Sequence, residues 1–429
     1  MKVIIRPETE MKNSGIEWMG NIPKDWDITK LGNLGEIQTG NTPDKSNSKY
    51  YSNENGVLWV KAENLGTIYP IEETSEYITE AGIGLARIFD KNTVFVCCIA
   101  SIGKCGYSNK RSSCNQQING ISFDKLFWKY GLYMTIAQEE EYLVSANGNV
   151  VKILNTNKQK MIKCPMPPLS EQQAIADYLD ETCSKIDEII AEAKASIDEY
   201  KNLREAVISN ATTRGIKKNR CMKSSGVEWV LEIPSDWDMI PAKVLFSQSN
   251  ERKHVDDVQL TASQKYGIIS QVEYMKRENS RIVIATQGIE NWKHVEPNDF
   301  IISLRSFQGG LEKSDVSGCI TWHYVVLKAN NGVYYNYFKW LFKSDKYINA
   351  LQGTCNFIRD GQDLRFSNFV QVPLLAVPIE EQKEIADYLN KKVPKIDSLI
   401  AEKESLINDL EAYKKSLIYE VVTGKRKVV

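Results

Sequence analysis

The sequence predicts an α+β protein of two globular domains, each followed by a long helix. Two segments recur about 210 residues further along the chain, which indicates two halves of one plan. The repeated ends space their apolar residues by three and four, as helices do, whereas the middles carry short β-branched and aromatic runs between Gly, Asn and Pro. A length of 429 residues, with 42% hydrophobic and 25% charged residues, is typical of a folded protein of several domains.

The two repeats divide the chain. Residues 171–192 return as residues 381–402 with 13 of 22 positions identical, and residues 14–27 return as residues 225–238 with nine of 14 identical. Four tryptophans of the second repeat recur at fixed offsets, which favours a packing role for Trp18, Trp26, Trp229 and Trp237. The repeats predict four segments, namely domain 1 (1–168), helix 1 (169–215), domain 2 (216–377) and helix 2 (378–429).

Each repeated end predicts a long helix that stops at a Thr–Gly pair, at residues 213–215 and 423–424. Pro394 predicts that the second helix restarts or kinks there, and by analogy the first would restart near Ser184. A helix of about 26 residues from that point spans roughly 40 Å. Because the same stripe occurs twice, an intramolecular coiled coil is favoured over an ordinary helical hairpin in a core. The predicted stripe comprises Ile175, Leu179, Ile186, Ile189, Ala193, Tyr200, Leu203 and Val207, then Ile385, Leu389, Ile396, Leu399, Leu406, Leu410, Tyr413 and Leu417.

The middles predict strands followed by helices. The strand candidates are VLWVKAENL, TVFVCCIASIGKCGYS, RIVIATQGI and DFIISLRSF. The helix candidates are LFWKYGLYMTIAQEEEYL and YYNYFKWLFKSDKYINALQG. We therefore expect two α+β domains of about 160 residues each.

Composition excludes several classes of protein. No run approaches about 18 apolar residues, and the N-terminal apolar stretch is too short for a signal peptide, so a cytoplasmic protein without a membrane role is expected. The nine cysteines lack paired zinc-ligand spacing and the three histidines are scattered, so buried or loop thiols and no metal site are predicted. The net charge of −1 conceals an acidic helix, with ten acidic and five basic residues between 169 and 215. The remainder permits DNA binding through local patches but does not require it.

Motifs of catalysis are missing from the sequence. Gly103-Lys104 is not a phosphate-binding loop, because Cys98 stands where the first glycine should be and Cys105 follows the lysine. No glycine-rich cofactor fingerprint follows a strand. The Asn/Asp-Pro-Pro-aromatic signature of amino-methyltransferases is also absent. The sequence therefore predicts a protein that reads a ligand and does not transform it.

Several motifs carry a resemblance to a known family. They are SGxEWxxxIPxDWD in both halves, PPLSEQQAIADYLD…KIDEIIAE, VPIEEQKEIADYLN…KIDSLIAE, TPDKSNSKYY with GVLWVKAENL, CNQQINGI and LRSFQGG. In this order the motifs cover essentially the whole chain. The sequence resembles the specificity subunits of type I restriction-modification systems.

The resemblance implies two target-recognition domains, each reading one half of a bipartite, asymmetric double-stranded DNA site. It implies that the two helices pair antiparallel as a coiled coil with pseudo-twofold symmetry. The helices would set the gap between half-sites and dock methyltransferase subunits, two of them, with restriction subunits joining the assembly. S-adenosylmethionine, ATP and Mg²⁺ would belong to those partners, and this chain would hold no cofactor. The alternatives are a coiled-coil interaction scaffold without a DNA role and a stand-alone DNA-modifying enzyme.

The candidate DNA contacts are basic and amide side chains in loops, because base reading needs such groups. They are Lys104, Lys110, Arg111, Asn115, Gln116, Arg305, Gln308, Arg359 and Arg365. Each has a structural alternative: the CNQQI and LRSFQGG motifs can be turns that hold the fold, and Arg359 and Arg365 can lie in a solvated loop.

The candidate docking residues are identical in both repeats and unneeded for the apolar stripe. They are Glu171, Gln172, Asp177, Glu381, Gln382 and Asp387. Capping and solvation explain the two glutamates equally well.

Overall fold

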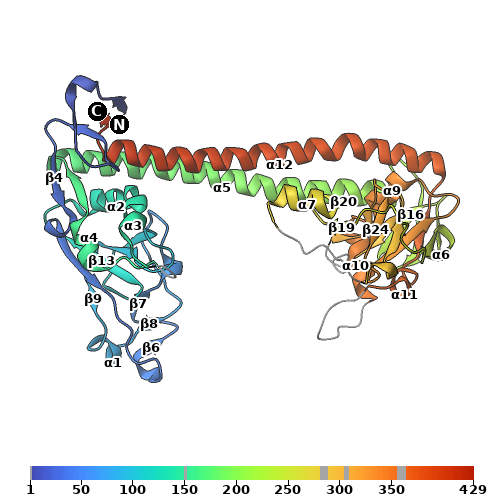
Figure 1. The fold of residues 1–429 in the computed structure, drawn as a ribbon, viewed down its shortest axis with the longest axis horizontal. Helices are drawn as coiled ribbons and strands as arrows, with labels where there is room; N and C mark the ends of the chain where they lie inside the picture. The colour runs from blue at the N-terminus through green and yellow to red at the C-terminus, as the bar shows by residue number, and fades with distance from the viewer. Residues whose placement is uncertain (1, 149–151, 281–287, 304–308, 355–363) are drawn as a thin grey trace. The chain divides into compact units, whose positions relative to one another are not determined.

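The computed structural model describes residues 2–148, 152–280, 288–303, 309–354 and 364–429. The chain forms two compact units (Figure 1). Unit 1 comprises residues 1–193 and 405–429, and unit 2 comprises residues 194–404. Each unit thus contains one globular part and a portion of both long helices, and both units mix helices with strands. The predicted α+β class is confirmed.

Unit 1 is built on two sheets. The four-stranded antiparallel sheet has the order β11-β10-β13-β5, and the five-stranded sheet has the order β6-β8-β7-β12-β9. Phe89 and Phe95 meet edge to face in the core that joins them. The strands are β1 (Val3–Ile5), β2 (Met11–Asn13), β3 (Asn21–Pro23), β4 (Asp27–Lys30), β5 (Gly35–Thr39), β6 (Tyr51–Ser52), β7 (Val57–Val60), β8 (Tyr77–Ile78), β9 (Ile88–Phe89), β10 (Thr93–Cys97), β11 (Cys105–Ser108), β12 (Ser112–Cys114), β13 (Ile118–Phe123), β14 (Lys163–Met166) and β27 (Arg426–Val428). The short helices are α1 (Glu80–Ile83), α2 (Trp128–Ala137), α3 (Glu139–Ser145) and α4 (Thr156–Met161).

Unit 2 carries a four-stranded antiparallel sheet of order β18-β25-β22-β23, with the two-stranded sheets β21-β24 and β19-β20. Its core centres on Phe246, whose ring contacts those of Phe300, Phe338, Phe342 and Phe369. The strands are β15 (Met222–Val227), β16 (Val230–Pro234), β17 (Asp238–Ile240), β18 (Phe246–Ser249), β19 (Leu260–Ser263), β20 (Gly267–Ser270), β21 (Lys293–Val295), β22 (Phe300–Ile302), β23 (Glu312–Lys313), β24 (Gly318–Ile320), β25 (Val325–Ala329) and β26 (Leu374–Ala376). The helices are α6 (Ala242–Leu245), α7 (Gln271–Glu278), α9 (Tyr335–Leu341), α10 (Asp345–Gly353) and α11 (Phe366–Phe369).

The two four-stranded sheets have the same internal order. Written from the other edge, the unit 2 sheet is β23-β22-β25-β18. Counted along the chain, the four strands of each sheet then stand in the order third, second, fourth and first. Strands form within VLWVKAENL, TVFVCCIASIGKCGYS and DFIISLRSF, and helices form within both helix candidates. In VLWVKAENL the strand ends at Val60 and a 3-10 helix follows at Ala62–Asn64. Of the strand candidate RIVIATQGI, residues 281–287 lie outside the described residues.

The predicted long helices are α5 (Leu169–Arg214, 46 residues) and α12 (Ile379–Val422, 44 residues). The prediction of a restart is wrong, because both helices are continuous and Pro394 lies inside α12. Pro394 and Asn390, the residue whose carbonyl loses its partner to a proline, are both exposed, so water can satisfy that carbonyl. The predicted Thr–Gly ends are confirmed: Gly215 and Gly424 adopt φ +73 and +72.

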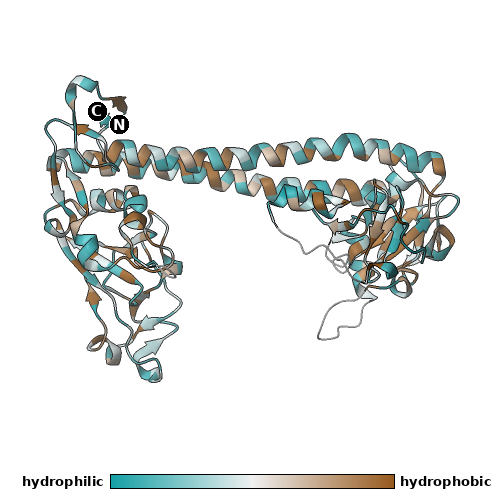
Figure 2. Cartoon of the chain, in the orientation of Figure 1, coloured by the Kyte–Doolittle hydropathy of each residue, from teal (hydrophilic) through white to brown (hydrophobic). Residues whose placement is uncertain are grey.

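The buried apolar stripe of the long helices differs from the predicted one. Figure 2 shows hydrophobic residues interspersed with hydrophilic ones along both helices. The predicted stripe includes Ile189, but this residue is 46% exposed, and its neighbour Ile190 is buried instead. An α-helix of 3.6 residues per turn drifts against a strict seven-residue repeat, which shifts the buried positions. Five residues of the predicted stripe are exposed, namely Ile189, Leu203, Leu399, Leu406 and Tyr413.

One ion pair joins the two long helices within each unit. In unit 1, Lys414 Nζ lies 2.6 Å from both carboxylate oxygens of Asp187. In unit 2, Arg204 Nε donates to Asp397 Oδ1 at 2.9 Å. Among the described residues, none of the helices has the length and apolarity needed to cross a membrane.

Candidate nucleic-acid interface

Three loops meet at one end of the four-stranded sheet of unit 1, and we call this end the loop edge. They are residues 40–44 after β5, residues 98–104 between β10 and β11, and residues 115–117 between β12 and β13. The backbone N–H of Cys98 donates to the carbonyl of Gln117 at 2.8 Å. The Thr42 hydroxyl donates to the Gln116 side chain. The strand ends therefore gather polar loop residues from three separate parts of the sequence.

The turn at residues 115–117 is held by its backbone and by Asn115. The Ile118 N–H donates to the Asn115 carbonyl at 3.2 Å, and Asn115 Oδ1 accepts from the Gln117 N–H at 3.0 Å. Asn115 is thus engaged in the turn, which supports the fold-holding alternative for this residue. The side chains of Gln116 and Gln117 are exposed at the tip. An amide at such a tip has the donor and acceptor that reading a base edge requires.

Of the other predicted contacts of unit 1, Lys104 lies in a loop of this edge but is engaged within the fold, and Lys110 and Arg111 lie away from the edge. Lys104 is half-buried, and its ammonium donates to the Ala62 carbonyl at 3.1 Å, so it ties two loops together. Lys110 and Arg111 are exposed but precede β12, whereas Gln116 follows it. Three strand residues span about 10 Å, so neighbours in sequence are separated here by the length of the strand.

In unit 2 most predicted contacts cannot be placed. Arg305, Gln308 and Arg359 lie outside the described residues. Arg365 is exposed and immediately precedes α11, where its backbone N–H donates to Asn368 Oδ1 at 3.1 Å. Gly310, which ends the LRSFQGG motif, has φ +75, and a Cβ there would lie 2.0 Å from the Phe342 carbonyl oxygen, so only glycine fits.

Unit 2 has a turn that sequence reasoning missed. Residues 321–324 connect β24 to β25, as residues 115–118 connect β12 to β13, and the Tyr324 N–H donates to the Thr321 carbonyl at 3.1 Å. Trp322 is 54% exposed and stacks on His323 with ring centroids 3.5 Å apart. No motif connects this segment to CNQQI, because the backbone turn is shared while the side chains differ. Only the matching sheet order reveals the correspondence.

The repeated Glu–Gln pair holds the start of each long helix, and we call each such arrangement a helix clamp. In unit 1, Trp26 is fully buried and its indole N–H donates to Glu171 at 2.8 Å, while Arg6 pairs with the same carboxylate. In unit 2, the buried Trp237 donates to Glu381 at 3.1 Å. The predicted packing role of these two tryptophans is confirmed.

The glutamines of the helix clamps bond backbone groups of the globular parts. Gln172 accepts from the N–H of Phe127 at 2.8 Å, and Gln382 accepts from the N–H of Tyr334 at 2.7 Å. Phe127 and Tyr334 are the residues immediately before α2 and α9, so each glutamine caps the start of a short helix. Both glutamines are buried, so their identity in the two repeats has an explanation within the fold.

One tyrosine in each unit bonds the C-terminal end of a long helix, α12 in unit 1 and α5 in unit 2. The Tyr130 hydroxyl donates to the Val422 carbonyl at 3.0 Å, and the Tyr337 hydroxyl donates to the Thr212 carbonyl at 2.7 Å. Both tyrosines are fully buried, and burial raises the pKa of both phenols well above the ordinary value. They therefore remain neutral donors to the carbonyls at helix C-termini.

The remaining docking candidates and the cysteines differ in exposure. Asp177 and Asp387 are exposed on the long helices. Of the cysteines that the structure describes, Cys221 is exposed and the others are buried. Burial raises the pKa of Cys105 and of Cys164 to about 12, so these thiols are not nucleophiles at neutral pH.

Comparison with known proteins places this architecture. Residues 23–199 match the family model of the type I restriction modification DNA specificity domain. The type I restriction enzyme MjaIX specificity subunit of Methanocaldococcus jannaschii is 31% identical over 47% of this chain and 48% of its own length. The MjaVIII specificity subunit of the same organism is 24% identical over 95% of this chain and 94% of its own. Residues 23–199 of this chain are thus similar to the DNA specificity domain, and the chain as a whole is similar to type I restriction enzyme specificity subunits.

A solved structure shares the fold of this chain. It comes from a study of complex assembly and conformational transition of the type I R-M system, and it matches with a TM-score of 0.70 at 12% identity over 94% of this chain and 99% of that chain. Against MjaIX, the chain spans about half the length of the relative that it matches.

Proposed function

We propose that this chain is the non-catalytic DNA specificity subunit of a type I restriction-modification complex, and that it reads a bipartite, asymmetric site with one half-site per unit. One observation carries the proposal. The two units have the same sheet order, but the same turn exposes Gln116 and Gln117 in unit 1 and Trp322 and His323 in unit 2. A shared scaffold with different tips is what two different half-sites require.

The backbone of the turn supports a reading role for its tip. In both units the turn closes with one backbone hydrogen bond between its first and fourth residues. The side chains at the tip are not needed for that bond and are exposed. Selection on DNA sequence can therefore change Gln116 or Trp322 without changing the turn. Amides read base edges, and an exposed indole offers a stacking surface.

We further propose that α5 and α12 pair antiparallel as a coiled coil with pseudo-twofold symmetry. The two ion pairs support this arrangement, because moving 17 residues up α5, from 187 to 204, moves the partner 17 residues down α12, from 414 to 397. The contacts at the helix ends also support an antiparallel pair. Unit 1 holds the start of α5 and the end of α12, and unit 2 holds the start of α12 and the end of α5. The pair would set the gap between half-sites.

The partners follow from the proposed family role. Two methyltransferase subunits would dock on the long helices, and restriction subunits would join them. Asp177 and Asp387 are the docking residues that we retain, because they are exposed. Gln172, Glu381 and Gln382 are buried, and Glu171 is engaged by Trp26 and Arg6. S-adenosylmethionine, ATP and Mg²⁺ would belong to the partner subunits.

The test is a methylome. The chain is co-expressed with its cognate methyltransferase in a host free of DNA methylation, and modified bases are mapped by single-molecule sequencing. We expect one asymmetric motif of two parts with a fixed unspecified gap. Inserting one heptad in each long helix should widen the gap and leave both half-sites unchanged. A stable complex with the methyltransferase that modifies no DNA would instead support a scaffold, and turnover by the pure chain would support an enzyme.

A further inference from the structure

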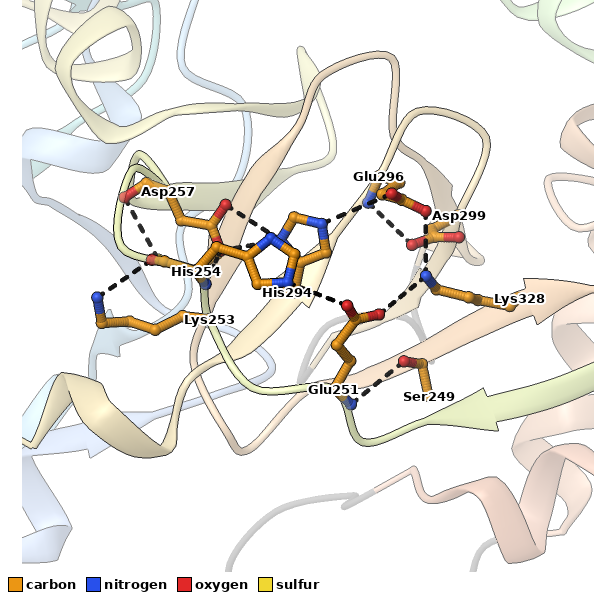
Figure 3. A network of polar contacts seen from close by, with 10 residues as sticks. Ser249, Glu251, Lys253, His254, Asp257, His294, Glu296, Asp299 and Lys328 are labelled. Atoms are coloured by element: carbon orange, nitrogen blue, oxygen red, sulfur yellow. Dashed lines mark hydrogen bonds and ion pairs between the residues drawn. The ribbon is translucent and has the colours of Figure 1, made fainter.

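Unit 2 contains a compact cluster of potential metal ligands that the proposed function does not use (Figure 3). Glu251, His254 and His294 each offer one ligand atom, and these atoms all lie within 4.8 Å of one another. Two of the three histidines of the chain meet here although 40 positions separate them in sequence. The expectation of scattered histidines is therefore wrong for this pair, since the fold brings together what the sequence keeps apart.

Backbone bonds fix the segments that carry these ligands. Glu251 and His254 lie in the segment after β18, and His294 lies at the centre of β21. The His294 N–H donates to the Glu251 carbonyl at 2.9 Å, and the Lys253 N–H donates to the Trp292 carbonyl at 2.9 Å. The ligands are thus presented by two strands of backbone that are already joined.

A buried carboxylate orients the buried histidine. Asp257 and the His294 ring are both almost fully buried, and His294 Nδ1 lies 2.9 Å from Asp257 Oδ2. The same oxygen accepts from the His254 N–H at 2.7 Å. A carboxylate on Nδ1 fixes the tautomer with the proton on that nitrogen, so the lone pair is left on Nε2. This is the outer-shell arrangement found behind histidines that bind metals.

A lysine orients two further carboxylates. Lys328 Nζ lies 3.2 Å from Glu251 Oε2 and 3.1 Å from Glu296 Oε2. The other oxygens face the imidazoles, with Glu251 Oε1 3.0 Å from His254 Nε2 and Glu296 Oε1 3.8 Å from His294 Nε2. Lys328 therefore holds both carboxylates with one oxygen turned toward an imidazole.

These separations suit one divalent ion. Two ligand atoms about 2.0–2.2 Å from an ion, at a tetrahedral angle, lie about 3.3–3.6 Å apart. The two imidazole–carboxylate separations, 3.0 and 3.8 Å, bracket that value. Three carboxylates contact the two imidazole rings, while Lys328 and Lys253 are the lysines of this network, so carboxylates outnumber lysines around the rings. Imidazole and carboxylate ligands together suit zinc and its neighbours in the first transition row.

We propose that Glu251, His254 and His294, with Glu296 as a fourth ligand, form a divalent metal site of the zinc class that clamps the segment after β18 to β21. The two rings stack with centroids 3.7 Å apart, so one ring must turn for both to face an ion. His254 is the exposed ring, with 55% of its side chain accessible, and it is the one that turns. The site would stabilise one end of the unit 2 sheet at the position that residues 40–44 occupy in unit 1.

Cobalt titration of the full chain tests this proposal. The protein is stripped with a chelator, and Co²⁺ uptake is followed by visible d–d absorption, with Zn²⁺ as the competing ion. We expect one Co²⁺ per chain, displaced by Zn²⁺, and no near-ultraviolet thiolate-to-cobalt band, because the proposed ligands are nitrogen and oxygen. Zn²⁺ should also raise the thermal unfolding midpoint.

The chain supplies matched variants for this experiment. H254Q and E251Q change exposed ligands, so they leave the buried Asp257–His294 pair intact, and each should weaken Co²⁺ binding at least tenfold. H323Q alters the third histidine, which stacks on Trp322 outside the cluster, and should bind as the wild type does. The proposal is overturned if the wild-type chain takes up neither ion, if H254Q binds normally, if H323Q loses binding, or if a thiolate band accounts for the cobalt spectrum.

Discussion

The helix clamps of the two units make the same bond to a tryptophan, but their glutamate side chains are buried to different extents. Glu171 and Glu381 each accept the indole N–H of a buried tryptophan, but the Glu171 side chain is 18% exposed and that of Glu381 is 3% exposed. The cation differs too: Arg6 pairs with Glu171, whereas Arg220 pairs with both oxygens of Glu381. The acceptor and the tryptophan come from the repeats, and the cation comes from outside them. The comparison shows that a buried carboxylate constrains its neighbours to supply a charge, from whichever segment lies near.

The largest expected loss of stability comes from replacing the glutamate of a helix clamp. E381Q should destabilise unit 2 by about 2–3 kcal/mol, because the buried charge-assisted bonds to Arg220 are lost while Asp236 remains as a partner of Arg220. E171Q should destabilise unit 1 by about 1–2 kcal/mol, since water reaches Glu171 and reduces the loss. Hydrogen exchange with mass spectrometry under increasing urea reads the two units separately. Equal losses in the two variants would show that exposure does not decide the strength of the helix clamp.

The next effect concerns the capping glutamines. Gln382 bonds the Tyr334 N–H and the carbonyls of Gly332 and Val377, whereas Gln172 bonds the Phe127 N–H and the Pro167 carbonyl. Truncation removes these bonds, and because Gly332 is exposed and Tyr334 is half-buried the loss for Q382A should total about 1–2 kcal/mol. Q382A should therefore cost unit 2 more than Q172A costs unit 1, in the same exchange experiment. The reverse order would mean that water replaces the lost bonds in unit 2.

Substitutions at the turn tips should change DNA recognition and leave the stability of the fold unchanged. Q116A should weaken the preference for one half-site by on the order of tenfold, about 1.4 kcal/mol, and W322A should do the same for the other. The measurement is binding of the assembled complex to duplexes that carry single substitutions in either half-site. K110A, which changes an exposed residue at the opposite end of β12, is the control and should leave both preferences intact. A loss at both half-sites from one variant would contradict the assignment of one unit to each.

The smallest effect lies in the helix ion pairs. In the Asp187–Lys414 pair one ammonium contacts both carboxylate oxygens, and this pair is less exposed than the Arg204–Asp397 pair. Double-mutant cycles with alanine should give a coupling of about 1 kcal/mol for the first pair and about 0.5 kcal/mol or less for the second, since exposed pairs contribute little. Unfolding of the single and double variants in urea supplies the four values. No coupling in either pair would remove one support for the antiparallel arrangement.

The repeats allowed the fold class and the helix ends to be predicted, but not the part played by Glu171, Gln172, Glu381 and Gln382. A repeated polar residue off the apolar stripe looks like a docking residue, because a sequence does not show which backbone groups its side chain reaches. Phe127 and Tyr334 lie about 45 residues away from the glutamines that bond them. The continuous α12 was missed because the cost of a proline depends on whether water reaches the freed carbonyl.

The candidate site was predicted in part. The CNQQI motif concentrates amide groups and so predicts Gln116 as a contact, and the structure places Gln116 at an exposed tip. Trp322 was missed because an isolated tryptophan in an apolar context is usually a packing residue. Lys110 and Arg111 were grouped with Gln116 by sequence distance, which ignores the strand between them. His254 and His294 were missed because side chains 40 positions apart give no spacing signal.

Unit 1 consists of two segments, residues 1–193 and 405–429, and this affects the order in which the two units fold during synthesis. Unit 2 is continuous in sequence, so all of its contacts are available once residue 404 has left the ribosome. Unit 1 has to wait, because the buried Tyr130 hydroxyl finds its acceptor only at Val422. We therefore expect the first-synthesised globular part to complete its folding last, with an exposed surface held open through most of translation.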